Sequence, residues 1–496
     1  MLELPILSIS ILLPLFSALY ITLFISHSKS SRKQIYAMYV AILASVLTLI
    51  STTYLLASFD TDISDFQFVE RYHWIDSIGL EFYVGVDGLS VYFIFLTALL
   101  TLICIVASLF TIKKNIKEFL LCFLLLESFC IGAFSALNLL LFYGFFEVIL
   151  IPMYLIIGVW GGENRVYAAV KFFLYTFFGS VFFLIALIYI YSHIGTFNII
   201  ELAAILPGFS LEVQQWLWFA TFISFAVKVP MFPFHTWLPD AHVQAPTAGS
   251  VMLAGILLKL GAYAFLRISL PMLPGASEYF ATYVLWFSGF AVIYASLVAL
   301  AQTDMKKMIA YSSVAHMGYV TGGIFSFSVT GIQGAVFQMI SHGLISSALF
   351  LVVGVLYERH HTKEIAKYGG VASSMPILAA VFMIAMLGSV GLPGLSGFIG
   401  EFLSILSIFD VNPVVGIACA FGVILGAVYM LKLYKCVMFG KAFNAAITKF
   451  DDLKLYEKAA LIPLISLIIY IGLIPGGILA AINMPARNLA EVYGVF

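Results

Sequence analysis

About fourteen apolar runs, each long enough to cross a bilayer, follow one another along this chain with short loops between them. A bilayer core offers no water, so a spanning segment must satisfy its own backbone hydrogen bonds, as helices and closed barrels do. Runs of this length fit helices, since barrel strands need only about ten residues. The sequence therefore predicts an all-α polytopic membrane protein with about 14 transmembrane helices. The expected spans are 4–25, 35–57, 87–111, 118–137, 138–159, 169–191, 213–232, 243–267, 280–301, 308–326, 331–357, 377–409, 413–438 and 459–483.

Composition supports this class, because only 10% of the 496 residues are charged and 62% are hydrophobic. Soluble proteins carry nearer a quarter charged residues. The formal net charge of −1 gives no indication of a nucleic-acid partner. The first run contains Pro5 and Pro14 and lacks a basic leader and a small-residue cleavage site, so we expect a retained helix rather than a signal peptide.

The loop charges test the helix count. If odd and even helices run in opposite directions, one side receives only Arg71, Arg267 and Arg487, while Lys228 and Lys259 lie inside spans. The other 19 of the 24 Lys and Arg fall on the opposite side. This split follows the positive-inside rule, so both termini and the acidic loop 60–76 should face outside. The inner-side residues are Lys29, Arg32, Lys33, Lys113, Lys114, Lys117, Arg165, Lys171, Lys306, Lys307, Arg359, Lys363, Lys367, Lys432, Lys435, Lys441, Lys449, Lys454 and Lys458.

Two spans carry helix-breaking residues. Prolines follow Lys228 closely, and the segment GLPGLSG at 391–397 interrupts a later span. Interrupted helices at corresponding places in two halves indicate inverted repeats with ion sites near the membrane centre. We therefore expect four parts: an N-terminal group of three helices at 1–117, a first repeat at 118–268, a second, inverted repeat at 279–440, and an inner loop with a C-terminal helix at 441–496.

Lys228 and Lys259 lie deep within apolar segments, where an ammonium group is costly unless it is paired or hydrated. Desolvation and a nearby carboxylate act on the pKa of a lysine in opposite directions. A lysine balanced between them can release and regain a proton near neutral pH. A static salt bridge that holds a broken helix is the alternative for Lys228, and close helix packing is the alternative for Lys259.

Two glutamates are similarly placed. Glu147 lies in the run LLLFYGFFEVILIPMYLIIGVWGG, and Glu401 follows the 391–397 break by one turn. We expect Glu147 to pair with a buried lysine and Glu401 to take the lysine's place in the second half. A protonated, hydrogen-bonded carboxyl and a helix-capping carboxylate are the respective alternatives. For Glu127, a structural role is at least as well supported as a functional one.

Two histidines stand in polar rows. His316 follows Ser312 and precedes Tyr319, whereas His342 lies between Gln338 and Ser346. Such i, i+4 rows can hold a water chain, and histidine passes protons near neutral pH. Interhelical hydrogen bonding is an equally open reading. Metal ligation is disfavoured because no second ligand has a suitable spacing.

The sequence contains no motif for redox chemistry or nucleotide binding. The five cysteines form no CxxC pair, and neither GxGxxG after a strand nor GxxxxGK[ST] occurs. If redox chemistry takes place in the assembly, we expect another chain to perform it. The cysteines are Cys104, Cys122, Cys130, Cys419 and Cys436.

The segment HTWLPDAHVQAPTAGSVMLAGILLKLGAYAFLR closely resembles the signature of the subunit M family of NADH-quinone oxidoreductase, whose mitochondrial counterpart is NADH dehydrogenase subunit 4. FFEVILIPMYLIIGVWGG, QTDMKKMIAYSSVAHMGYV, QMISHGLISSALFLVVGVLYERH and GLPGLSGFIGEF extend the resemblance over most of the chain from about Gly85. These are antiporter-like membrane subunits of respiratory complex I.

The resemblance implies a fold of fourteen helices with two inverted five-helix repeats. It implies that Glu147, Lys228, Lys259 and Glu401 match the family's buried charges. From the polar rows, we expect His316 and His342 to carry protons between Lys259 and Glu401. The resemblance also implies that NADH, FMN, iron–sulfur clusters and quinone are bound by other subunits, with no cofactor or metal on this chain. The expected partners are other membrane subunits of complex I, especially the sister antiporter-like subunits, in a bacterial inner or mitochondrial inner membrane.

Three rival functions stay open. A subunit of a multisubunit sodium/proton antiporter is similar in both lysines, but the sister subunits and antiporter subunits resemble one another in carrying lysine where this chain has Glu401. A purely structural membrane subunit would use its buried charges only to fix helix register. A small-molecule transporter fits least, because no cluster of substrate-shaped polar groups stands out.

Overall fold

The computed structural model describes residues 4–24, 31–109 and 111–495, and the side chains of residues 31–33 and 76 are also outside the description. Lys29 and the side chains of Arg32 and Lys33, which we assigned to the inner side, therefore lie outside the described residues. Within the described residues, eleven helices are long and apolar enough to cross a membrane. The helix α9, the helix α15 and the interrupted pair α18–α19 account for the remaining predicted spans. The prediction of an all-α polytopic membrane protein is confirmed.

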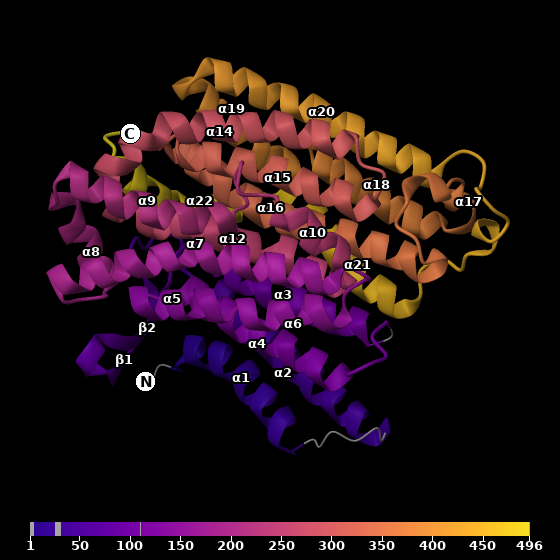
Figure 1. Cartoon of the computed structure of the whole chain (residues 1–496), viewed down its shortest axis with the longest axis horizontal. Helices are drawn as coiled ribbons and strands as arrows, with labels where there is room; N and C mark the ends of the chain where they lie inside the picture. The colour runs from indigo at the N-terminus through magenta and orange to yellow at the C-terminus, as the bar shows by residue number, and fades with distance from the viewer. Residues whose placement is uncertain (1–3, 25–30, 110, 496) are drawn as a thin grey trace. The chain divides into compact units, whose positions relative to one another are not determined.

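The first of two compact units contains residues 1–229, 256–280 and 480–496 (Figure 1). Its elements are α1 (Ile6–Phe24), α2 (Ser31–Ala57), β1 (Gln67–Ile75), β2 (Leu80–Val86), α3 (Val91–Ser108), α4 (Ile116–Ser135), α5 (Leu139–Val148), α6 (Leu150–Trp160), α7 (Arg165–Ile194), α8 (Ile199–Ile205), α9 (Leu211–Lys228), α12 (Leu258–Ala264) and α13 (Leu270–Met272). Most of α22 (Gly476–Glu491) and the start of α14 (Pro274–Leu300) also belong to it.

The second unit contains residues 230–255 and 281–479. Its elements are α10 (Trp237–Gln244), α11 (Thr247–Met252), the larger part of α14, α15 (Met305–Ile324), α16 (Val329–His360), α17 (Val371–Ser374), α18 (Pro376–Val390), α19 (Ser396–Val411), α20 (Pro413–Met438) and α21 (Leu455–Leu473). The long helix α16 packs against α15, α18, α19 and α21, so its apolar run is buried throughout. These units describe packing and not internal symmetry, so the repeat boundaries 118–268 and 279–440 stay a prediction.

Short polar residues between the apolar runs define several helix starts. The side chain of Asn138 accepts hydrogen bonds from the backbone N–H groups of Leu140 and Leu141 at the start of α5. Asp304 does the same for Lys307 in α15, and Ser328 for Gly331 in α16. Each cap satisfies a backbone donor that has no partner within the first helical turn.

The helix interruptions are more numerous than expected. Both predicted breaks occur, between α9 and α10 and between α18 and α19, where Gly391 has a φ of +78° and Gly394 a φ of +94°. A third falls at Ile149 between α5 and α6, directly after the helix that carries Glu147. Two π-helical turns, Leu253–Leu257 and Phe265–Ser269, flank α12. Such turns commonly mark functional sites.

Two local expectations need correction. Residues 67–86 form an antiparallel β-hairpin that we did not expect, with Tyr72 opposite Phe82. The last predicted span, 459–483, instead ends at Leu473, and α22 is a separate helix. The inner loop that follows α20 contains a single 3₁₀ turn, Ile447–Lys449.

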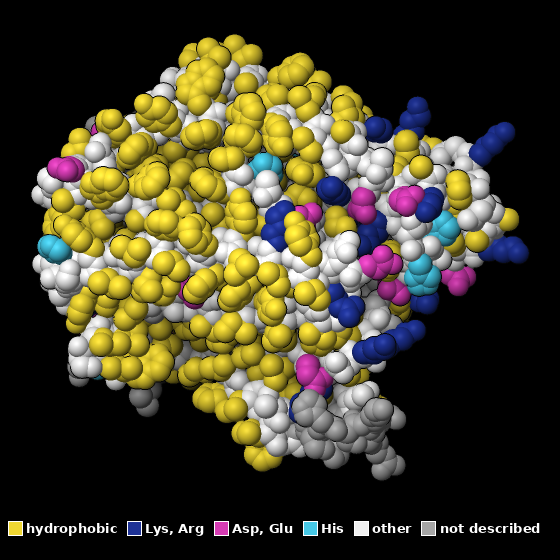
Figure 2. Space-filling view, in the orientation of Figure 1, with side chains coloured by type: hydrophobic (Ala, Val, Ile, Leu, Met, Phe, Trp, Pro, Cys, Tyr) yellow, Lys and Arg dark blue, Asp and Glu magenta, His cyan; other side chains and the backbone are white. Residues whose placement is uncertain are grey.

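The surface shows the pattern expected of a membrane protein. On the face drawn in Figure 2, hydrophobic side chains cover a broad area, while lysine and arginine side chains gather apart from it. Many large hydrophobic side chains of α2, α7, α14 and α20 are exposed. Lipid is the environment that such surfaces require.

Candidate functional site

The two buried lysines of the first unit lie on neighbouring helices. Lys228 is the last residue of α9 and is 4% exposed, while Lys259 lies in α12 and is fully buried. Gly261 allows these helices to approach closely, because a Cβ there would lie 2.9 Å from the Cβ of Lys228. The prediction that both lysines are embedded in the protein interior agrees with the structure.

Lys228 is held by the helix that carries Glu147. Its Nζ donates a hydrogen bond of 2.6 Å to the carbonyl oxygen of Phe146 and lies 3.6 Å from the centre of the Phe146 ring. Glu147, the next residue, interacts with Lys228 electrostatically and with Ser180 through a hydrogen bond. Its Oε1 has no hydrogen-bond partner among the described residues. The expected Glu147–Lys228 pairing is therefore electrostatic, while the direct contact of the ammonium is with the backbone.

In the second unit, His316 and Glu401 come together, although 85 positions separate them in the sequence. His316 Nδ1 lies 2.8 Å from Glu401 Oε1, at an angle outside hydrogen-bond geometry. The contact is therefore chiefly electrostatic. Gln338 Nε2 donates a hydrogen bond of 3.2 Å to the same carboxylate oxygen, and Ser389 Oγ lies 3.3 Å from His316 Nε2. The His342 ring lies 5.5 Å from the His316 ring, centre to centre.

A small cavity adjoins this cluster. Its volume is about 10 Å³, which is close to the minimum for one water molecule. Titratable groups line it together with hydroxyls, so a water there would have polar partners. Its polar lining residues are Ser296, His316, Tyr319, Ser389, Glu401 and Tyr429. This arrangement suits proton exchange between a carboxylate and an imidazole.

Several buried polar residues were missed or misplaced by the sequence reasoning. His235, His242 and Asp87 stand near the ends of predicted spans, where hydration makes charge inexpensive, but all three are buried. His242 stacks on Phe350 with ring centres 4.6 Å apart.

Lys306 is the clearest departure from the loop assignment. The loop charges place it with Lys307 on the inner side, outside the spans, but it is 3% exposed. Its Nζ donates a hydrogen bond of 2.8 Å to the carbonyl oxygen of Ala245, between α10 and α11. The carbonyl that precedes Pro246 thus gains a donor that the broken helix cannot supply.

Glu127 is fully buried in α4. Ser45 Oγ donates to its Oε2 over 3.4 Å, and its Oε1 has no hydrogen-bond partner among the described residues.

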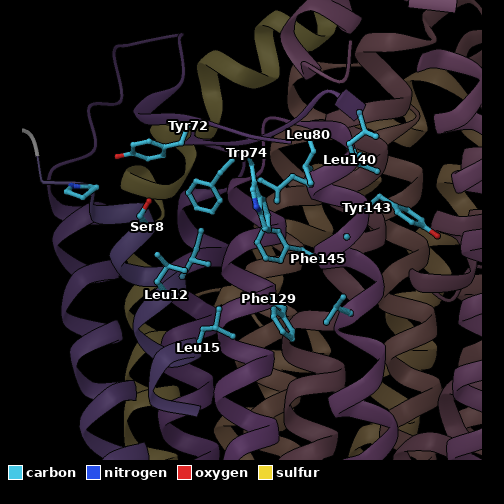
Figure 3. Close-up of a pocket in the computed structure, with 17 residues that line it drawn as sticks. Ser8, Leu12, Leu15, Tyr72, Trp74, Leu80, Phe129, Leu140, Tyr143 and Phe145 are labelled. Atoms are coloured by element: carbon cyan, nitrogen blue, oxygen red, sulfur yellow. The ribbon is translucent and has the colours of Figure 1, made fainter. Parts of the chain in front are cut away.

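A cavity of about 940 Å³ in the first unit has none of these charged residues in its lining (Figure 3). It opens between α1, α5 and the β-hairpin, and its wall includes Leu12, Trp74, Phe129 and Phe145. The lining is almost wholly apolar, so this crevice fits hydrocarbon rather than ions.

The helical fold, with interrupted helices that carry buried lysine and glutamate, defines an antiporter-like polytopic membrane protein. The chain belongs to the NADH:quinone oxidoreductase/Mrp antiporter transmembrane family, whose profile matches residues 136–426. It is 68% identical to NADH-quinone oxidoreductase subunit M of Rickettsia bellii (strain RML369-C) over 99% of each chain. It is 46% identical to NADH-ubiquinone oxidoreductase chain 4 of Marchantia polymorpha over 91% of each.

Solved structures agree with this assignment. A chain of respiratory complex I from Thermus thermophilus is 29% identical, with a TM-score of 0.89, over 98% of this chain and 99% of that one. A chain of the Mrp complex from Dietzia sp. DQ12-45-1b has a TM-score of 0.84 over 98% of each chain, but at 20% identity it shows the fold alone.

Proposed function

We propose that this chain is a proton-translocating membrane subunit, of the M type, of NADH:quinone oxidoreductase. The relatives that match almost the whole chain carry that name, in bacteria and as chain 4 in a plant. The protein is thus a multi-pass membrane subunit of complex I, and its partners are the other membrane subunits, including the sister antiporter-like subunits. The membrane is the bacterial inner membrane, or the mitochondrial inner membrane for organelle-encoded relatives.

The observation that carries the proposal is the buried His316–Glu401 contact beside a water-sized cavity. An imidazole 2.8 Å from a carboxylate can exchange a proton with it without large movement. Ser389 and Gln338 hold the pair in place. We infer that protons reach Glu401 by way of His342 and His316 and leave from it to the outside.

In the first unit, Glu147 and Lys228 serve as the switch. Lys228 is anchored to the backbone of α5 at Phe146, so a shift of that broken helix would move the ammonium relative to Glu147. The charge of Lys228 would then alter the proton affinity of Lys259, which lies on the adjacent helix. Electron transfer in other subunits supplies the trigger, and we propose that those subunits hold the NADH, FMN, iron–sulfur and quinone sites.

The test uses Glu147→Ala and Lys228→Ala in the assembled complex. We expect proton pumping, measured by a pH-sensitive dye in inverted membrane vesicles, to fall in both variants. Ser192→Ala is a suitable control, because Ser192 is exposed at the end of α7. Undiminished pumping together with normal electron transfer in both variants would remove this chain from the pumping path.

The alternative function, a subunit of a multisubunit sodium/proton antiporter, is less supported. It shares the fold, but Glu401 stands where the antiporter subunits resemble one another in having lysine. Purification in mild detergent separates the two: NADH-oxidising subunits should accompany this chain, and antiporter subunits alone would support the alternative.

A further inference from the structure

A buried ion pair lies beyond Lys259, at the end of the helical segment that carries this lysine. Arg267 Nη2 donates to Asp87 Oδ1 over 2.6 Å, and the two side chains are 9% and 8% exposed. The same Asp87 oxygen accepts a hydrogen bond of 3.1 Å from the backbone N–H of Leu89. The pair joins the turn before α3 to the second π-helical turn, 180 positions away in the sequence.

Tyr263 lies between Lys259 and this ion pair. Lys259, Tyr263 and Arg267 follow one another at intervals of four residues, which places them along one side of the helix. The Tyr263 hydroxyl accepts a hydrogen bond of 3.1 Å from Arg267 Nε and donates one of 2.9 Å to the carbonyl oxygen of Phe134. A tyrosine has a single hydroxyl proton, so this proton is committed to a carbonyl that cannot pass it on.

Other parts of the same unit cover the pair. The ring of Phe66, just before β1, lies 4.8 Å from the Arg267 guanidinium. A Cβ at Gly88 would lie 1.7 Å from the carbonyl oxygen of Ala481, so the backbone of α22 rests directly on the turn after Asp87. Phe66 thus covers Arg267, and α22 covers the turn after Asp87, on the side that the loop charges predict to face outside.

We propose that Arg267 and Asp87 form a proton seal at the outer end of the first unit. An arginine does not lose its proton in proteins, so Arg267 cannot relay one. Asp87 Oδ1 already accepts hydrogen bonds from Arg267 Nη2 and from the backbone N–H of Leu89, so both side chains are committed to fixed partners. A fixed guanidinium also raises the electrostatic barrier to protons, as arginine does in water channels. The cluster around Glu401 differs, because it combines titratable groups with room for water. The seal rests on the proposed function, since it matters only if Lys259 carries protons.

The test is the double variant Asp87→Asn/Arg267→Gln in the assembled complex. It removes both charges together, so no unpaired charge is buried. We expect NADH oxidation to continue while the passive proton leak of de-energised vesicles rises about ten-fold, which corresponds to a barrier lowered by about 1.4 kcal/mol. Adding Lys259→Met to the double variant should abolish the extra leak, because protons would reach the opening only through Lys259.

The other possible outcomes contradict either the proposed seal or the proposed function, and they can be told apart. A leak that stays at the wild-type level in the assembled double variant contradicts the seal. A leak that persists after Lys259→Met shows a structural opening and contradicts it equally. Normal pumping with Lys259→Met alone would instead contradict the proposed function. If the double variant does not assemble, Arg267→Lys keeps a cation that can release its proton. We then expect a smaller Lys259-dependent leak, and a wild-type leak overturns the seal.

Discussion

The close approach of α12 to α9 predicts a measurable cost for one added methyl group. An ideal Cβ at Gly261 would lie 2.7 Å from the carbonyl oxygen of Phe225, 2.8 Å from Val229 Cγ2 and 2.9 Å from the Cβ of Lys228. Two of these atoms belong to the backbone or are fixed to it, so they cannot rotate away. The helices must move apart, and we expect Gly261→Ala to destabilise the first unit by about 1–3 kcal/mol, the usual cost of overpacking.

Gly144→Ala is the matched control, because a Cβ there meets nothing within 4 Å. Both glycines lie in helices, so the control should be neutral or stabilising by about 0.4–1 kcal/mol. The assay heats the detergent-extracted complex in steps and measures the chain that stays soluble. Each kcal/mol should lower the midpoint by about 2–4 °C for a unit of this size.

The same change should disturb function. A displaced α9 strains the 2.6 Å contact between Lys228 and the Phe146 carbonyl, so pumping should fall more than NADH oxidation. Equal midpoints for Gly261→Ala and Gly144→Ala would refute the reasoning, because they would show that α12 and α9 do not touch at Gly261.

Three further predictions concern the second unit. Glu401→Gln preserves the shape of the side chain but not its charge, so the complex should assemble at wild-type levels and lose its proton pumping. Pumping is followed with a pH-sensitive dye, and retained pumping would contradict the role of Glu401. Lys306→Met leaves the Ala245 carbonyl without its donor and should destabilise the chain by about 1–3 kcal/mol, seen as a lower thermal midpoint. Arg359 now donates hydrogen bonds of 2.8 and 2.7 Å to the buried Glu457 carboxylate. Arg359→Ala removes this cation, so we expect the free energy of unfolding to fall by about 3–5 kcal/mol. A wild-type yield of assembled complex would argue against this.

Hydrophobic run length and loop charge were enough to predict the fold class. A spanning helix has few alternatives in lipid, so an apolar run such as Val329–His360 specifies its own structure. The breaks after Lys228 and at Gly391 were also readable, because proline and glycine act on the backbone locally.

The β-hairpin could not be read from these signals. Its strands lie outside the apolar runs and are held by pairing with each other, such as Glu70 opposite Val84. The break at Ile149 had a local signal that we did not use, because Pro152 cannot donate a backbone hydrogen bond to the carbonyl of Val148. The two π-helical turns were not predicted from run length or loop charge.

The site was predictable where a residue's surroundings along the chain decide its burial. Glu147, Lys228 and Lys259 are flanked by apolar residues on both sides; the two lysines are buried and Glu147 is partly buried. Asp87 and Lys306 stand at span ends, where the local sequence suggests hydration. Asp87 is buried against Arg267, and Lys306 is buried against the carbonyl of Ala245. Both partners are distant in the sequence.

The central claim is that charges of both signs lie deep in the bilayer where water can reach them. A map of the assembled complex that resolves ordered water tests this most directly. We predict that water molecules contact Lys228, Lys259 and Glu401 and fill the cavity beside His316. A map that places these three side chains at the level of the lipid head groups, or sealed from any water, would contradict the account.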